Sequence, residues 1–134
     1  MQKKLGAHHF VVTSDPAQIE AAKGTFDFIL DTVSAEHDFN MYLSLLRTNG
    51  THICVGVPPK PAEIAAFILL GGRKSFAGSG IGGIKETQEM FDFFAENNIV
   101  SEIEMIEMKD IQNAYDRMTK GDVRYRFVID MATL

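Results

Sequence analysis

The sequence predicts an α/β protein whose strands form a parallel sheet covered on both faces. Short runs rich in β-branched and aromatic residues alternate with stretches of helical spacing along the 134 residues. The runs are almost continuously apolar, which is typical of parallel strands buried on both faces. Apolar residues make up 46% and charged residues 23% of the chain, ordinary values for a globular protein, so the composition argues against disorder.

Four strands are predicted in the first part of the chain. We expect them over residues 9–13, 26–31, 52–57 and 74–77. Right-handed crossover connections place successive parallel strands side by side. We therefore expect these four strands in one sheet and in sequential order.

The connections between these strands carry helix signals. Asp15 is a helix cap and Pro16 a first-turn proline, and Gly24 ends this helix. Apolar residues at helical spacing predict two further helices, over residues 38–46, closed by Asn49-Gly50, and over residues 62–70.

The last third of the chain alternates in the same way but is less apolar. A helix is expected to begin near Lys85, and apolar residues at i, i+3, i+4 and i+7 predict another over residues 110–119. Residues 103–107 alternate as a half-exposed edge strand does, and residues 125–131 form a final strand. The acidic residues of this region are interpreted as a solvated face: Glu102, Glu104 and Glu107.

Charge and cysteine content exclude several classes of function. The net charge of −5 and the isoelectric point near 5.3 leave no basic excess for a nucleic-acid backbone. The single cysteine, Cys54, can form no internal disulfide, which favours a reducing cytoplasm. The longest apolar run, residues 64–70, is too short to span a bilayer, and the N-terminus does not resemble a signal peptide. We expect a cytoplasmic protein without nucleic-acid or membrane partners.

A glycine cluster, Gly78 to Gly83, matches the pattern G-x-G-x-x-G after a predicted strand and before a predicted helix. In that context glycines let a pyrophosphate approach a helix N-terminus, and Glu107 at the end of the next strand could hold a ribose. The strand before the cluster carries Arg73 and Lys74 instead of an apolar run. A flexible turn without a ligand is the alternative.

Small and polar residues end three successive strands, at Asp31-Thr32-Val33, Val55-Gly56-Val57 and Gly78-Ser79-Gly80. In an open α/β sheet, ligands lie outside the carboxyl ends of the strands. Glycines there expose backbone groups to a flat ligand such as an amide-bearing ring. The alternative is that loops between strands and helices simply favour Gly, Pro and Asp.

Five segments of the sequence are characteristic: GAHHFVV at residues 6–12, FDFILDTV at 26–33, VGVP at 55–58, GIKETQEM at 83–90 and DVRYRFVID at 122–130. Together they resemble the zinc-dependent medium-chain alcohol dehydrogenases, and the last two resemble the cinnamyl alcohol dehydrogenase branch. The resemblance runs from about Lys4 to Met131. It implies an incomplete Rossmann-like parallel sheet, followed by a C-terminal strand–helix–strand segment. The implied boundaries are residues 1–95 for the partial cofactor domain and 96–134 for the segment that packs on the catalytic domain.

The resemblance also implies a nicotinamide site. Thr32 and Val33 would lie beside the nicotinamide ribose, and Gly56 and Val57 would offer backbone contacts to the nicotinamide. The loop that touches the carboxamide would be Ser79, Gly80 and Ile81, although Gly80 replaces a commonly bulkier residue. Arg126 would reach a cofactor phosphate, its alternative being a surface arginine. The glycine pattern at 78–83 is then a coincidence of this loop.

The family's zinc sites and its Gly-rich pyrophosphate loop are not matched in this sequence, which would correspond to the C-terminal part of such an enzyme. The four histidines have no metal-ligand spacing, and no residue here can be argued to be catalytic. The cofactor implied by the branch is NADP(H), with NAD possible, and zinc is implied only for the longer family protein. The resemblance further implies a small alcohol or aldehyde substrate and a homodimer.

Two functions of different classes follow. The first is an oxidoreductase portion that supplies half of a nicotinamide site and is inactive alone. The second is a non-catalytic nucleotide-binding or dimerisation module of the same fold. The sequence upstream of Met1 would separate them, because a Cys/His zinc set and a Gly-rich strand–turn–helix there would indicate the first.

Overall fold

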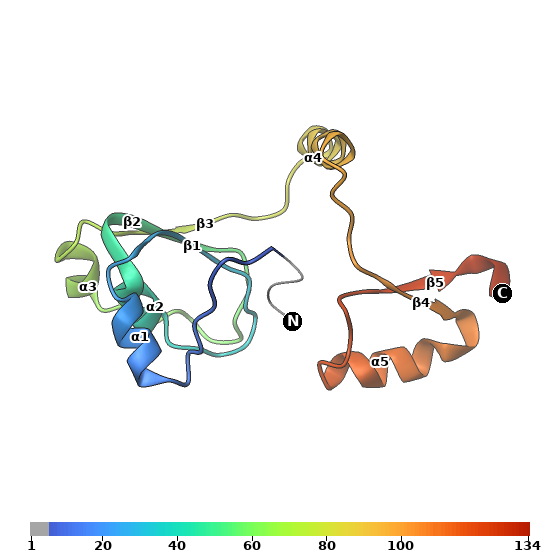
Figure 1. The fold of residues 1–134 in the computed structure, drawn as a ribbon, viewed down its shortest axis with the longest axis horizontal. Helices are drawn as coiled ribbons and strands as arrows, with labels where there is room; N and C mark the ends of the chain where they lie inside the picture. Colours follow the sequence, from blue (N-terminus) through green and yellow to red (C-terminus); the bar gives the residue numbers. More distant parts are fainter. Residues whose placement is uncertain (1–5) are drawn as a thin grey trace. The chain divides into compact units, whose positions relative to one another are not determined.

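The computed structural model describes residues 6–134, which divide into two compact units, one ending at Ile81 and the other beginning at Gly82 (Figure 1). Each unit has its own parallel sheet, which confirms the α/β class. Lys4, where the family resemblance begins, lies outside the described residues. No helix among residues 6–134 is long and apolar enough to cross a membrane. The division at residues 95 and 96 stays a prediction.

The first unit is built on three parallel strands in the order β1-β2-β3. These strands are β1 (Phe26–Asp31), β2 (Leu46–Cys54) and β3 (Ser75–Gly78). The register aligns Ile29 of β1 with His52 of β2, and His52 with Phe76 of β3. Side chains at these positions therefore share one face of the sheet.

The expected first strand over residues 9–13 is wrong, and so is the four-strand sequential order. These residues have irregular and turn conformations. In the doubly wound order 3-2-1-4-5-6, the third strand pairs with the second and the fourth with the first. The resemblance to the dehydrogenases implies that residues 9–13 correspond to the third strand of that order, and among the described residues they pair with no neighbouring strand.

The first unit contains three helices among its described residues (Figure 1). They are α1 (Pro16–Ala22), α2 (Phe39–Leu45) and α3 (Ala66–Leu70), the last beginning later than predicted. Asp15 caps α1 by accepting from the amides of Ala17 and Gln18, and Asp38 caps α2 by accepting from Asn40 N–H. The prediction that Asn49-Gly50 closes α2 is wrong: both residues lie within β2, where the pairing with β1 is irregular.

The core of the first unit lies between α2 and one face of the sheet. Phe39 and Leu43 of α2 are buried, as is His52 of β2. The Phe39 ring contacts the rings of His52 and Phe76 edge to face, with centroids 5.8 and 5.5 Å apart. On the opposite face Phe28 and Leu30 are 69% and 63% exposed, so among the described residues the sheet is covered on one face instead of both.

The second unit contains the predicted strand–helix–strand segment. Its elements are α4 (Ile84–Glu96), β4 (Glu104–Glu107), η2 (Met108–Asp110), α5 (Ile111–Thr119), β5 (Phe127–Asp130) and η3 (Met131–Thr133). β4 and β5 pair in parallel, with α5 in the connection between them. Glu104 is not a solvated residue as predicted: its carboxylate is half-buried and accepts from Arg117 at 2.8 Å and from Arg124 N–H at 2.8 Å.

Candidate functional site

The carboxyl ends of β1 and β2 are joined by their backbones. The amides of Val55 and Gly56 both donate to the Asp31 carbonyl oxygen, at 2.9 and 3.0 Å. This pairing brings the loop after β2 against the loop after β1. The carboxyl edge of a parallel sheet is where α/β proteins bind ligands.

Gly56 allows the two loops to touch. A Cβ atom at position 56 would lie 2.3 Å from the Val33 carbonyl oxygen and 2.9 Å from the Thr32 carbonyl carbon. No side chain fits at those distances, so only glycine permits this approach. The structure therefore brings Thr32, Val33 and Gly56 together, as the strand-end pattern predicts.

Val57 and the loop after β3 complete this edge. Val57 N–H donates to the Ser34 hydroxyl at 3.3 Å, and Ser79 N–H donates to the Cys54 carbonyl at 3.2 Å. Gly80 has open space around it and Ile81 is fully exposed. Seven of the eight predicted site residues thus follow the three strand ends of one sheet.

Arg126, the eighth predicted residue, belongs to the second unit. It is exposed and lies directly before β5, where its carbonyl accepts from Glu104 N–H at 2.8 Å. Its role toward a cofactor stays a prediction.

Sequence reasoning missed a polar cluster beneath the strand ends. The Asp31 carboxylate is 6% exposed; its Oδ1 accepts from Val33 N–H at 2.9 Å, and its Oδ2 lies 2.7 Å from His37 Nε2. His52 Nε2 lies 3.5 Å from the same Oδ2. The spacing of Asp31 and His37 in the chain carried no recognisable motif, and only the register of β1 and β2 places His52 beside them.

This environment shifts the pKa values of the two histidines in opposite directions. Burial acts to lower the pKa of His37, but hydrogen bonds with the Ala35 carbonyl and Asp31, and the charges of Asp31 and Asp38, raise it above the usual value. Burial lowers the pKa of His52, although the Asp31 charge opposes that shift. His52 is fully buried and neither ring nitrogen has a hydrogen-bond partner. The Asp31 carboxylate is therefore the partner of His37, whereas burial disfavours the charged form of His52.

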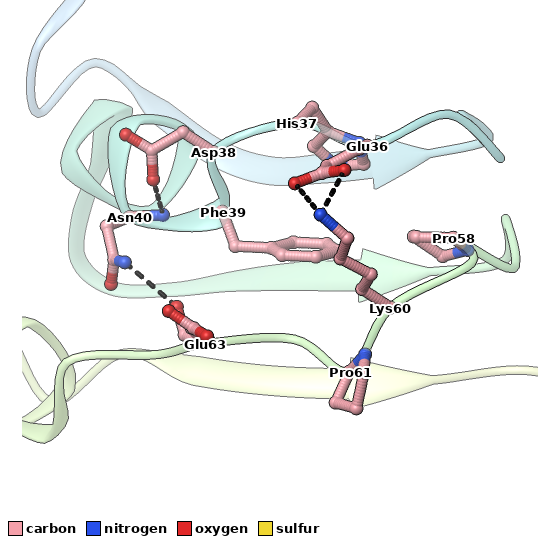
Figure 2. A pocket seen from close by; sticks show the side chains of 9 residues that line it. All are labelled: Glu36, His37, Asp38, Phe39, Asn40, Pro58, Lys60, Pro61 and Glu63. Carbon is pink, nitrogen blue, oxygen red and sulfur yellow. Dashed lines mark hydrogen bonds and ion pairs between the residues drawn. The ribbon is translucent and has the colours of Figure 1, made fainter.

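A cavity of about 390 Å³ lies beside this cluster, between the start of α2 and residues 58–63 (Figure 2). Lys60 pairs with Glu36 at 2.9 Å. Asn40 donates to the Glu63 carbonyl and accepts from Ala65 N–H, both at 2.9 Å. These contacts tie the segment after β2 to α2.

No group of three or more His, Cys, Asp or Glu side chains within residues 6–134 could hold a metal ion. The glycine pattern at residues 78–83 also lacks an open helix N-terminus. Gly83 N–H donates to the Glu86 carboxylate at 2.7 Å, where a phosphate oxygen would otherwise accept. Glu107, the candidate ribose ligand, pairs with Lys109 at 2.5 Å. This geometry supports the interpretation of residues 78–83 as a strand-end loop.

Comparison with known proteins gives one consistent family. Residues 1–96 match the family described as zinc-binding dehydrogenase. The chain is 54% identical over 129 residues to cinnamyl alcohol dehydrogenase 2 of Arabidopsis thaliana, covering 96% of this chain and 34% of that protein. It thus spans about a third of the length of the relatives it matches.

Solved structures share the fold as well as the sequence. A cinnamyl alcohol dehydrogenase from Sorghum bicolor superposes with a TM-score of 0.92 at 43% identity, covering 96% of this chain and 36% of that one. The CAD of Helicobacter pylori in complex with NADP(H) gives a TM-score of 0.75 at 42% identity, covering 85% of this chain and 34% of that one.

Proposed function

The chain belongs to the zinc-binding dehydrogenase family of medium-chain alcohol dehydrogenases, and from that premise we propose that it forms the nicotinamide-side wall of the cofactor domain in an NADP(H)-dependent alcohol dehydrogenase or aldehyde reductase. The wall residues in this proposal are Thr32, Val33, Gly56, Val57, Ser79, Gly80 and Ile81. The proposed domain boundaries are 1–95 and 96–134, supported by the family match over residues 1–96.

The observation that carries the proposal is the contact of Gly56 with the Val33 carbonyl. It holds the loops after β1 and β2 together at the carboxyl edge of the sheet, where α/β proteins bind ligands. Val33 and Val57 flank it and are 44% and 81% exposed, so they can cover one face of the ring. The residues present therefore fit a nicotinamide.

A bound nicotinamide supplies hydride transfer, which no side chain can perform. In this proposal the chain's own residues bind and orient that ring: the Gly56 backbone contacts the ring, and Ser79 and Gly80 contact its carboxamide. Arg126 is proposed to contact a cofactor phosphate as an exposed guanidinium. The choice of NADP(H) is supported by the NADP(H) complex of the Helicobacter pylori relative.

The described residues do not fit a zinc site, so no step of the chemistry is assigned to a metal held by them. The longer protein's substrate is proposed to be a small alcohol or aldehyde, as the names of the relatives suggest. We further propose a homodimer, and a cytoplasmic location because the single Cys54 is a free thiol.

The proposal is tested by nuclear magnetic resonance of the 134-residue chain titrated with NADPH and with nicotinamide mononucleotide. The expected result is that the amides of Val33, Gly56, Val57 and Ser79 shift with both ligands, and that Gly56→Ala removes these shifts. Gly78→Ala is the matched control, because its added Cβ would meet Cys54 O at an ordinary 3.6 Å. Shifts confined to residues 82–86, or none at millimolar ligand, would overturn it.

A second function, a non-catalytic dimerisation module, is favoured by the exposure of Phe67 and Leu70 on α3, at 82% and 74%. Self-association without any cofactor-induced shift in the same titration would support that function instead.

A further inference from the structure

Asp31 connects the two loops of the proposed wall. Its carbonyl oxygen accepts from the amides of Val55 and Gly56, and its Oδ1 accepts from Val33 N–H. Moving the Asp31 side chain would release Val33, the residue against which Gly56 closes. The position of the wall therefore depends on what fixes the Asp31 carboxylate.

The ring of His37 fixes that carboxylate, and its geometry requires a proton on each nitrogen. Nδ1 lies 2.8 Å from the Ala35 carbonyl oxygen and Nε2 lies 2.7 Å from Asp31 Oδ2. A carbonyl and a carboxylate oxygen only accept hydrogen bonds, so both ring nitrogens must donate. A neutral imidazole would turn a lone pair toward one of the two oxygens. The imidazolium makes both bonds, and the one to Asp31 is charge-assisted.

The surroundings of His37 hold it in this place. Its side chain is 11% exposed, and its ring packs against Phe39 and Tyr42 of α2, with centroids 4.4 and 5.5 Å away. The charged and titratable groups facing it are Asp31 of β1, Glu36, Asp38, His52 of β2, and Lys60 and Glu63 across the cavity. Glu36 and Lys60 largely cancel as a pair, and His52 is buried without a partner, so the acidic groups prevail.

We propose that Asp31 and His37 are positioning residues of the nicotinamide wall: protonated His37 holds the Asp31 carboxylate, and that carboxylate holds the Val33 backbone where Gly56 meets it. The proposal deepens the function proposed above and rests on it. Loss of the His37 proton removes one of the two ring hydrogen bonds and loosens the loop from Asp31 to His37. The wall should then bind a nicotinamide more weakly as the pH rises through the pKa of His37.

The test uses the whole 134-residue chain without cofactor, followed from mildly acidic to alkaline pH by nuclear magnetic resonance. Both His37 ring nitrogens should be protonated at neutral pH, and the Val33 and Gly56 amides should shift together with His37. The protection of Val33 N–H from hydrogen exchange, relative to an unstructured chain at the same pH, should fall about ten- to hundredfold once the proton is lost, the loss expected for a hydrogen bond to a charged group. A neutral His37 at pH 7 would overturn the proposal, and so would a Val33 amide signal that does not change as His37 loses its proton.

Variants separate positioning from mere folding. His37→Gln keeps a hydrogen-bond donor that does not titrate. This variant should therefore keep Val33 N–H protected from hydrogen exchange and make that protection independent of pH. His37→Ala should lose the protection at every pH, and His8→Gln, a change at an exposed histidine, should alter neither. A His37→Gln chain that keeps the wild-type pH dependence would also overturn the proposal.

A subsequent NADPH titration tests the proposed function separately. If the Val33 amide titrates together with His37 but no wall amide shifts with the cofactor, the proposed function is wrong. The positioning of Val33 by His37 and Asp31 is then still supported. If the cofactor shifts the wall at every pH equally, the positioning role fails while the proposed function stands.

Discussion

The ring of His52 stacks on the ring of Phe76, with centroids 5.1 Å apart and planes 12° from parallel. The histidine is therefore packed as an aromatic core residue, although its two buried nitrogens have no hydrogen-bond partner. An unsatisfied buried polar group costs free energy that an apolar ring of similar shape does not.

Replacing this histidine by phenylalanine is expected to stabilise the first unit. His52→Phe removes the desolvation cost and keeps the stacking, so the free energy of unfolding should rise by about 1 kcal/mol. The pKa of folded His52 is lowered, so the unfolded chain binds the extra proton as the pH falls. Because the unfolded wild type takes up this proton, its free energy of unfolding should fall from about pH 7 toward pH 5. The free energy of unfolding of the variant should fall less over the same range. Urea denaturation at several pH values measures both effects; a variant less stable than wild type at pH 5 would contradict the argument.

Gly56→Ala is expected to destabilise the chain much more than Gly78→Ala. The added methyl group would overlap the Val33 carbonyl at 2.3 Å, whereas at position 78 it meets Cys54 O at 3.6 Å. Overpacking of this kind typically costs about 1–3 kcal/mol, because the backbone must move apart. Urea unfolding followed by circular dichroism compares the two variants. Equal stabilities would mean that the two loops separate without cost.

The strand ends were predictable because their signal is local. Asp31-Thr32-Val33 and Val55-Gly56-Val57 stop apolar runs with small and polar residues, a pattern that is typical of the carboxyl edge of a parallel sheet. The pairing of His37 and His52 with Asp31 was not predictable in this way. It depends on the register of two strands and on the turn that leads into α2, neither of which leaves a spacing signal.

The errors in the predicted fold also have physical causes. Residues 9–13 have strand composition, but a strand needs a neighbour, and the doubly wound order supplies none for them among the described residues. Asn49-Gly50 has turn chemistry, yet Asn49 takes a positive φ of 64° inside β2. Glu104 lies at a polar position of the alternating pattern over residues 103–107, which predicts a surface residue. Only the fold shows that Arg117 of α5 donates a hydrogen bond to it.

Glu104 is expected to make the second unit sensitive to acid. The hydrogen bond from Arg117 is the main reason that the pKa of Glu104 is lowered. A carboxylate with a lowered pKa contributes stability above its unfolded pKa, and that contribution is lost as the pH falls through its folded pKa. Glu104→Gln should therefore remove part of the acid destabilisation that circular dichroism detects below about pH 4.5. Glu102→Gln, at an exposed position, is the control and should leave the acid transition unchanged.

Self-association through α3 follows from its exposed apolar side chains. Phe67 and Leu70 are largely exposed, and neighbouring exposed apolar residues on one short helix are typical of an interaction surface. The wild-type chain should scatter light as a dimer or larger at high micromolar concentration, and the double variant Phe67→Asp, Leu70→Asp as a monomer. Ala62→Asp, outside α3, adds a charge without removing an apolar side chain and should leave the association intact. A monomeric wild type would count against the proposed homodimer.

The 134-residue chain alone is expected to bind a nicotinamide cofactor weakly and to turn over no alcohol or aldehyde. Acidic side chains already occupy the N-termini of three helices, with Asp15 at α1, Asp38 at α2 and Glu86 at α4, so a pyrophosphate cannot bind there without displacing them. Without several charge-assisted hydrogen bonds worth about 1.5–3 kcal/mol each, a micromolar affinity falls to about millimolar. Fluorescence titration with NADPH and NADH, followed by an assay of cinnamaldehyde and benzaldehyde reduction with added zinc, measures both properties. Saturable turnover, or a Kd below about 10 µM, would show a phosphate-binding site in this chain, and Gly78–Gly83 would then be the candidate phosphate-binding loop.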